Sequence, residues 1–237
     1  MPYTIERGGC SLEHPPFVHS LKRLSVVSIL DSMEKGRALS LKPSTTNQPL
    51  EFRNTSERGL NLDTVHQRIL HFMRLDPVAT YKFIIGTDCQ VHTGHTKFIT
   101  GVVIQRLGKG AWACYRQVIV PRALYSIKEK LSMETTLSEE IAMYFDENKR
   151  QDMENIVLPH LYQGATFDMF IHIDAGDDEN RNRTAKFVQE MVRRVESVGM
   201  VPVIKPDCYV ASAYANRFSK KPHRPLYEDH EVIDGSL

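Results

Sequence analysis

The order of hydrophobic periods along the chain predicts a layered α/β protein. Residues 61–77 carry apolar side chains near helical spacing, with Asp63 as the expected N-cap. Residues 81–91 (YKFIIGTDCQV) are apolar on both faces at their start, as expected of a central strand covered on each side. Two more strands are expected at residues 97–105 and 111–120. Short turns between these three strands predict an antiparallel meander.

The second half of the chain alternates helices and strands. A long helix is expected at residues 124–147, a strand at 167–174, an amphipathic helix at 184–198, a strand at 200–205 and a last helix at 209–218. Strands separated by helices pair in parallel through right-handed crossovers. The sequence therefore predicts one mixed five-stranded sheet, three antiparallel strands followed by two parallel ones, flanked by helices.

Composition divides the chain into three parts. Residues 1–56 are rich in proline and serine with one short apolar stretch (LSVVSIL), which predicts a weakly structured N-terminal extension. Residues 57–221 hold all the predicted elements and form one domain. Residues 222–237 are acidic and lack apolar periodicity, so we expect a flexible tail.

Overall charge and cysteine usage narrow the class of protein. The 237 residues are 41% hydrophobic and 25% charged with a net charge of +1, which is ordinary globular composition and argues against a nucleic-acid coat protein. Four separated cysteines without a C-x-x-C pair indicate neither a disulfide framework nor a zinc ribbon. No apolar run approaches the ~20 residues of a membrane helix. We therefore expect a soluble, cytoplasmic protein.

Four acidic residues occupy positions where a structural role alone would favour other residues. Asp88, Asp174 and Asp207 lie in or just after predicted strands, where binding sites gather in open sheets. Glu134 falls in the middle of the inward stripe of the long helix, whereas Glu139 is expected off that stripe. A carboxylate on a buried stripe requires a positive partner.

A divalent metal site would explain these acids together. Phosphodiester cleavage by two hard cations about 4 Å apart needs several carboxylates that converge from different elements. The alternative is structural, because each aspartate alone could cap a helix or a turn. The coexistence of all four favours a site for Mg²⁺ or Mn²⁺.

Four motifs resemble the ribonuclease-H-like YkuK family. They are residues 84–92 (IIGTDCQVH), 108–111 (GKGA), 172–176 (HIDAG) and 205–212 (KPDCYVAS), and the resemblance covers roughly residues 51–221. It implies a ribonuclease-H-like domain, in agreement with the order of elements. A nuclease activity follows from this only by analogy of fold.

The resemblance also implies a set of metal ligands that act in catalysis. In ribonuclease-H-like nucleases these acids come from the first strand, the first long helix, the fourth strand and the region of the last helix. The matching positions are Asp88, Glu134, Asp174 and Asp207. The family usually has an aspartate where this chain has Asn216, so the fourth ligand position is open between Asp207 and the position of Asn216.

Local charge predicts a nucleic-acid-binding flank. Residues 181–224 hold ten Lys and Arg against three acids, a net charge of +7. Such a flank would attract phosphates that the carboxylates repel, although a solvated helix surface has the same composition. The candidate contacts are Arg181, Arg183, Lys205, Arg217, Lys220 and Lys221.

The function expected from the sequence is a metal-dependent nuclease or related phosphodiester hydrolase acting on RNA or DNA. The alternative is a non-catalytic ribonuclease-H-like module that binds nucleic acid or a protein. An ATP-hydrolysing relative is a third possibility, against which stands the lack of a glycine-rich phosphate loop after the first strand. The oligomeric state is left open.

Overall fold

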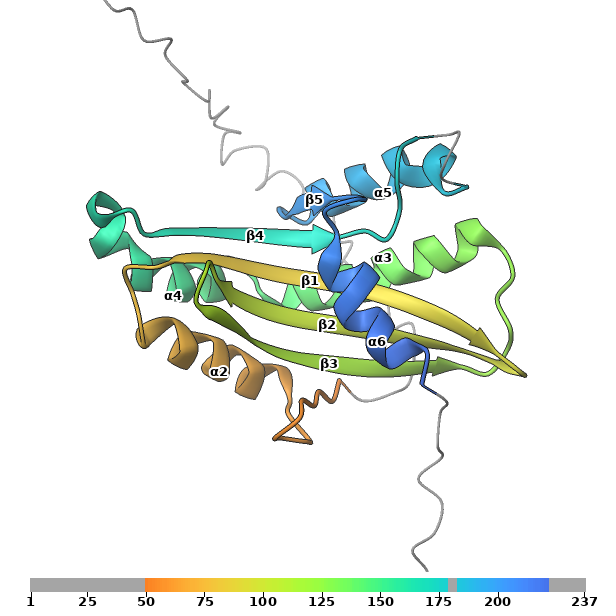
Figure 1. Cartoon of the computed structure of the whole chain (residues 1–237), viewed down its shortest axis with the longest axis horizontal. Helices are drawn as coiled ribbons and strands as arrows, with labels where there is room; N and C mark the ends of the chain where they lie inside the picture. Colours follow the sequence, from red (N-terminus) through yellow and green to blue (C-terminus); the bar gives the residue numbers. More distant parts are fainter. Residues whose placement is uncertain (1–49, 179–182, 222–237) are drawn as a thin grey trace, which may run out of the picture. The chain divides into compact units, whose positions relative to one another are not determined.

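A five-stranded sheet organises the described part of the chain (Figure 1), which in this computed structural model comprises residues 50–178 and 183–221. The strand order is β3-β2-β1-β4-β5. The strands are β1 (Thr80–His92), β2 (His95–Arg106), β3 (Gly110–Val120), β4 (Thr166–His172) and β5 (Val201–Val203). The pairs β1–β2 and β2–β3 are antiparallel, and β1–β4 and β4–β5 are parallel. The predicted mixed sheet is therefore confirmed.

Helices cover both faces of this sheet. The helical segments are α2 (Leu62–Arg74), α3 (Ile127–Tyr144), α4 (Glu147–Val157), the 3₁₀ turn η1 (Leu158–Gln163), α5 (Ala185–Ser197), the π-helical turn η2 (Val210–Ala215) and α6 (Asn216–Ser219). Buried residues of α2, α3, α4 and α5 share one core with the sheet. The segment formed by η2 and α6 crosses the other face (Figure 1).

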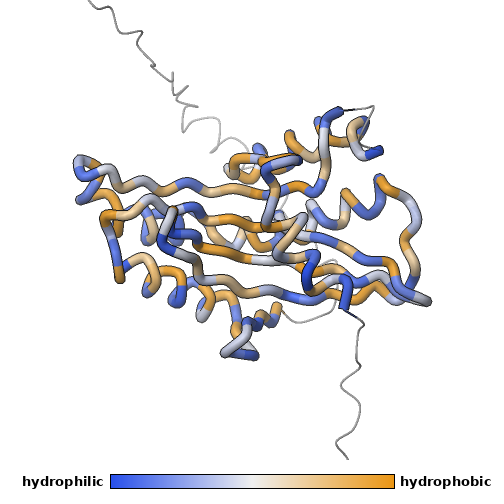
Figure 2. Tube along the Cα trace, in the orientation of Figure 1, coloured by the Kyte–Doolittle hydropathy of each residue, from blue (hydrophilic) through white to orange (hydrophobic). Residues whose placement is uncertain are grey.

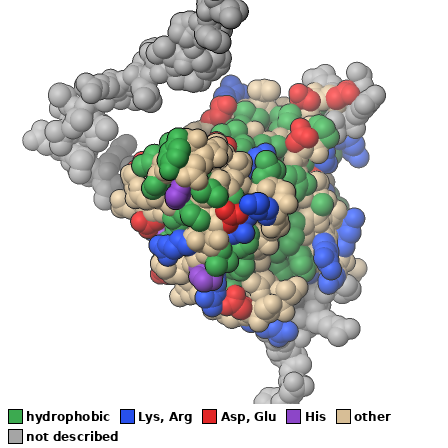
Figure 3. All heavy atoms as spheres, turned by 60° about the vertical axis from the view of Figure 1, so that its left-hand side comes forward, with side chains coloured by type: hydrophobic (Ala, Val, Ile, Leu, Met, Phe, Trp, Pro, Cys, Tyr) green, Lys and Arg blue, Asp and Glu red, His purple; other side chains and the backbone are tan. Residues whose placement is uncertain are grey.

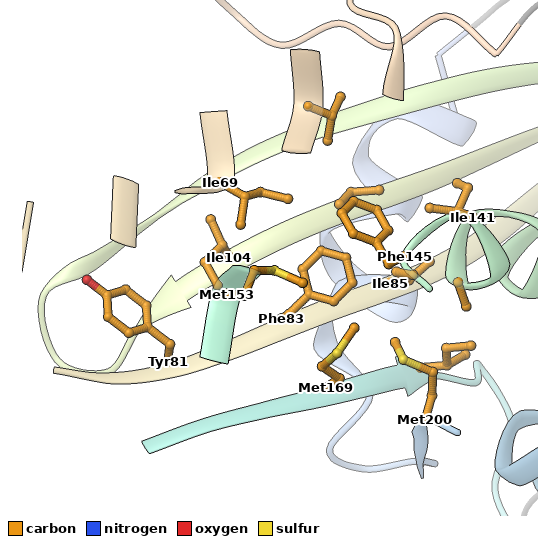
Figure 4. Close-up of a cluster of buried hydrophobic side chains, with 14 of the residues drawn as sticks. Ile69, Tyr81, Phe83, Ile85, Ile104, Ile141, Phe145, Met153, Met169 and Met200 are labelled. Atoms are coloured by element: carbon orange, nitrogen blue, oxygen red, sulfur yellow. The ribbon is translucent and has the colours of Figure 1, made fainter. Parts of the chain in front are cut away.

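The main core lies between the sheet and the helices α2, α3, α4 and α5 (Figure 4). Phe83 of β1 faces Phe145, which follows α3, with ring centroids 4.6 Å apart. The hydroxyl of buried Tyr81 donates to the carbonyl oxygen of Met73 at 3.1 Å. Hydrophobic stretches run along the strands in Figure 2, as expected because helices cover both faces of the sheet. Each fully buried side chain of this size contributes about 1.5–3 kcal/mol to stability.

Two paired glycines let the C-terminal segment lie directly on the sheet. Gly86 of β1 pairs with Gly101 of β2. A Cβ atom on Gly86 would lie 2.7 Å from the backbone nitrogen of Ala211, and one on Gly101 would lie 2.7 Å from Cδ1 of Tyr214. The absence of side chains at these two positions therefore sets how closely η2 approaches β1.

The start of α2 differs from the prediction by two residues. Asn61, rather than Asp63, is the N-cap, and its side-chain oxygen accepts the backbone N–H of Thr64 at 2.8 Å. Both residue types cap well. Asp63 lies in the first turn, where a negative charge interacts favourably with the helix dipole.

The long helix predicted at residues 124–147 is α3 (Ile127–Tyr144), and it is followed by a second helix, α4 (Glu147–Val157), that was not predicted. Ser126 caps α3, and Asp146 caps the separate helix α4 through its side chain. The sequence did not reveal α4 because it is mostly polar and buries only Met153 and Val157. Two apolar positions are too few for a periodic pattern.

Residues 50–60 pack onto the sheet. Phe52 is fully buried and pairs with Leu60, and Arg53 pairs with Tyr115 of β3. Residues 1–49 of the predicted N-terminal extension and the predicted acidic tail at 222–237 lie outside the described residues.

Large exposed hydrophobic side chains gather at the end of the sheet where β1 and β4 begin. They are Leu75, Val78, Leu107, Leu158, Leu161 and Tyr162. Figure 3 turns this end forward and shows hydrophobic side chains among charged ones. Within residues 50–178 and 183–221, none of the helices combines the length and apolar character needed to span a membrane.

Candidate metal centre

The candidate metal centre lies where β1 extends beyond its neighbour β4. The parallel ladder between them ends at the pair Gly86 and His172, although β1 continues to His92. Asp88 and Asp174 each follow this last pair by two residues. The register therefore brings these two carboxylates to the same level at an open edge of β1, with adjacent strands about 4.8 Å apart.

Asp88 is buried at this edge, with 8% of its surface exposed. Its side chain lies on the η2 side of the sheet, where Oδ2 accepts a hydrogen bond from the hydroxyl of Ser219. Burial raises the pKa of Asp88 to about 6, and the negative charge of Asp174 adds to the rise. The Ser219 hydrogen bond opposes the rise because it stabilises the charged form.

Glu134 approaches the same edge from α3, on the opposite face of the sheet. The hydroxyl oxygens of Thr87 and Ser138 lie 2.8 Å apart and join α3 to β1 at this level. Burial raises the pKa of Glu134 to about 8, and the charges of Asp88 and Asp174 contribute. The thiol of Cys89 donates a hydrogen bond to Glu134, which opposes this rise.

Asp174 completes the group from the loop after β4. Its Oδ1 lies 3.3 Å from Nζ of Lys205 and 3.8 Å from Sγ of Cys208. A cavity of about 10 Å³ lies against Glu134 and Asp174, which is room for about one water molecule. The structure therefore groups three of the four predicted acids, each from a different element.

The donor set of this group fits a hard divalent cation. The negative charges of the three carboxylates repel one another. Lys205 contacts Asp174, whereas the charges of Lys130 and Lys220 act on Glu134 and Asp88 from further away. Carboxylate oxygens are the ligands that Mg²⁺ and Mn²⁺ prefer. In the described ranges, no three His, Cys, Asp or Glu side chains are placed so that together they could hold a metal ion as they stand.

The two candidates for a fourth ligand lie elsewhere. Asp207 is exposed in the loop before η2 and lines a separate hollow with Lys82, His172 and Tyr209. Asn216 donates through Nδ2 to the carbonyl oxygen of Ser212 at 3.1 Å within its own helical segment. The side chain of this segment that reaches Asp88 is Ser219.

Part of the predicted basic flank adjoins the carboxylates. Lys205 contacts Asp174. The charge of Lys220 favours ionised Asp88 and partly offsets the rise in its pKa that burial and Asp174 cause. Arg181 lies outside the described residues.

The other predicted cations lie farther along the surface. Arg183 and Lys186 line a hollow of about 600 Å³ near the start of α5. Arg217 and Lys221 lie over the ring of Phe218, at 6.0 Å and 5.5 Å from its centroid.

Lys97 and Ser219 support the centre, and neither was predicted. Lys97 of β2 is 3% exposed and donates to the carbonyl oxygens of Phe218 and Lys221, each at 2.8 Å. It therefore fixes the end of α6, which places Ser219 beside Asp88. A lysine within an apolar strand was the available signal, but its partners are more than 100 positions away.

Glu139, expected to point away from the core, is buried instead. It is 8% exposed, and its carboxylate accepts hydrogen bonds from Arg194 of α5. The ion pair satisfies the buried charge and joins α3 to α5.

Comparison with known proteins shows the family of the chain. The family model described as Ribonuclease H-like matches residues 64–220, and the chain belongs to this ribonuclease H-like family. More particularly, it is similar to the uncharacterized protein YkuK of Bacillus subtilis strain 168, with 39% identity over 169 residues that cover 71% of this chain and 96% of YkuK. No solved structure matches the chain.

Proposed function

We propose that this protein is a metal-dependent nuclease, a phosphodiester hydrolase that acts on RNA or DNA. Asp88, Glu134 and Asp174 would hold Mg²⁺ or Mn²⁺. The observation that carries the proposal is the meeting of these carboxylates at the open edge of β1, with the pKa values of Asp88 and Glu134 raised to about 6 and about 8. Such crowding of acids is unfavourable without a cation and is typical of functional sites.

The residues around the centre have separable roles in this function. The carboxylates come from β1, α3 and the loop after β4, so they can hold the cation from both faces of the sheet. Bound divalent cations supply activation of water and stabilisation of charge on the leaving oxygen. Lys205 and Lys220 lie beside the acids and would attract the phosphate backbone. Ser219 keeps one oxygen of Asp88 oriented.

Metal binding is the first test of this function. Calorimetric titration with Mg²⁺ and Mn²⁺ should give saturable binding to the wild-type protein that Asp88→Asn and Asp174→Asn each remove. Asp168→Asn is the matched control, because Asp168 is an exposed aspartate of β4 away from the centre. Loss of binding in the control as well would indicate a general charge effect and would contradict the proposed site.

Cleavage is the second test. Labelled single-stranded and double-stranded RNA and DNA are incubated with each variant and Mg²⁺ or Mn²⁺. The proposal expects cleavage by the wild-type protein and the Asp168→Asn control, and none by Asp88→Asn or Asp174→Asn. Binding of nucleic acid without metal binding or cleavage would favour the non-catalytic module, for which Asn216 in place of the family's usual aspartate is the supporting observation.

A further inference from the structure

A second hollow lies on the η2 side of the sheet, next to the carboxylates. Its volume is about 500 Å³, within the range of small-molecule sites. The side chains that give it chemical character are Lys82, Phe170, His172, Asp207 and Tyr209. Two are aromatic, one is a cation, one is a carboxylate and one is an imidazole.

His172 gives this hollow a hydrogen-bond donor at one defined nitrogen of its ring. The residue is 4% exposed, and its Nδ1 accepts the backbone N–H of Val210 at 3.1 Å. A ring nitrogen that accepts a hydrogen bond carries no proton, so the proton of this ring is on Nε2. Within the described parts of the chain, Nε2 has no protein acceptor. The Nε2–H group is therefore available to a ligand in the hollow.

The loop before η2 provides a flat wall and an acceptor. The Tyr209 ring is 42% exposed, and its hydroxyl donates to the side-chain oxygen of Gln105 at 2.6 Å, which fixes the orientation of the ring. Backbone hydrogen bonds from Asp207 to Ile204 at 3.0 Å and from Tyr209 to Asp207 at 2.9 Å hold the loop. Asp207 is exposed and lines this hollow.

Lys82 adds positive charge to the lining of the hollow. Its Nζ lies 5.6 Å from the centroid of the Phe170 ring. A planar ligand in contact with Tyr209 or Phe170 would thus meet a donor, an acceptor and a cation together. Nucleotides match this set, because their bases are flat, carry both donors and acceptors, and are attached to a phosphate.

We propose that this hollow binds one unpaired nucleobase of the substrate strand, a role that rests on the proposed nuclease function. Tyr209 and Phe170 provide stacking surfaces, His172 Nε2 donates to the base and Asp207 accepts from it. A paired base has its hydrogen-bonding edge occupied, so the substrate class is single-stranded nucleic acid. The location supports this role, since His172 is only two residues from Asp174 and a bound strand can reach both.

Binding in the absence of metal tests the inference separately from cleavage. The full chain is titrated into fluorescein-labelled single-stranded RNA and DNA and their duplexes in EDTA, and fluorescence anisotropy is recorded. Tyr209→Ala should weaken single-strand binding by about tenfold, because a stacking surface is lost. Tyr209→Phe retains the ring but loses the hydrogen bond to Gln105 that orients it, so it should weaken binding by less than Tyr209→Ala does.

Asp207→Asn separates base recognition from general charge. Removal of a negative charge should strengthen binding of any polyanion, and Asp168→Asn, at an exposed aspartate of β4 that does not line the hollow, measures that effect. The asparagine amide oxygen still accepts, but a hydrogen bond to a carboxylate is roughly twice as strong as one to an amide. If Asp207 accepts a hydrogen bond from the base, Asp207→Asn should therefore weaken binding several-fold despite the favourable change in charge.

Three outcomes would contradict the inference. Wild-type affinity in both Tyr209→Ala and Asp207→Asn, with cleavage intact, would overturn the base site and leave the nuclease proposal standing. Equal affinity for duplexes and single strands would overturn the unpaired base. Absence of any binding or cleavage of nucleic acid by the wild-type protein would overturn both proposals.

Discussion

Ser219 donates a hydrogen bond to Oδ2 of Asp88, 131 positions earlier in the chain. The end of α6 is thus in contact with the carboxylate of the central strand. The backbone carbonyl of Ser219 also lies 3.2 Å from Nε2 of His92 at the end of β1. The charge state of the candidate centre and the docking of α6 are therefore physically coupled.

Ser219→Ala should raise the pKa of Asp88 in the metal-free protein. The hydroxyl stabilises the charged carboxylate, so its loss favours the protonated form and moves the pKa upward from about 6. The measurement is an NMR titration of the labelled aspartate carboxyl carbons in EDTA. Ser212→Ala is the matched control, because the Ser212 hydroxyl donates to the carbonyl oxygen of Cys208 and not to Asp88. An unchanged or lower pKa in Ser219→Ala would contradict the assigned contact.

Metal-free protein should lose stability as the pH rises through the raised pKa values. Asp88 and Glu134 hold protons more tightly when folded than when unfolded, since their pKa values are about 6 and about 8. This contribution is complete below the ordinary carboxyl pKa of about 4 and is lost as the pH passes the folded values. The free energy of unfolding in EDTA should therefore fall between about pH 4 and pH 8.

Two variants isolate this effect from other titrating groups. Asp88→Asn and Glu134→Gln cannot ionise, so each should gain stability relative to wild type as the pH rises. Chemical denaturation at several pH values measures the difference, with Asp168→Asn as the exposed control. A constant difference from wild type at all pH values would contradict the raised pKa values. Addition of Mg²⁺ should remove most of the difference at high pH.

Gly86→Ala should destabilise the protein by roughly 1–3 kcal/mol, as expected for overpacking a buried contact. The added Cβ would lie 2.7 Å from the backbone nitrogen of Ala211 and 3.2 Å from its Cβ. The second change Ala211→Gly should restore only part of the loss, because the closer contact is with backbone. Urea denaturation of the single and double variants measures both effects. Full restoration would mean that side-chain contact alone sets the distance between η2 and β1.

Much of this fold was predictable because local patterns determine it. Residues 81–91 read as a central strand, and β1 spans Thr80–His92 between β2 and β4. The apolar pattern of residues 124–147 also predicted the helix, α3, that carries Glu134. Helix α4 was not predicted, since a mostly polar helix held by two buried side chains leaves no periodic signal.

The grouping of Asp88, Glu134 and Asp174 follows from spacing and topology, whereas the environment of each acid does not. The pairing of Glu139 with Arg194 joins residues 55 positions apart. The contact of Ser219 with Asp88 depends on how closely η2 approaches the sheet. Such contacts depend on tertiary packing, which a single sequence without its fold does not specify.

Lys97→Met tests whether α6 is held in place by one buried cation. Nζ of Lys97 donates to the carbonyl oxygens of Phe218 and Lys221, so methionine would keep the apolar stem and lose both hydrogen bonds. Since hydrogen bonds from a charged donor are worth about 1.5–3 kcal/mol, the end of α6 should open locally. Amide hydrogen exchange in residues 216–220 should become faster while exchange in the central strands changes little. Faster exchange throughout the sheet would mean instead that Lys97 supports the whole fold, and unchanged exchange at 216–220 would mean that the contacts of Ser219 and Phe218 suffice to hold the helix.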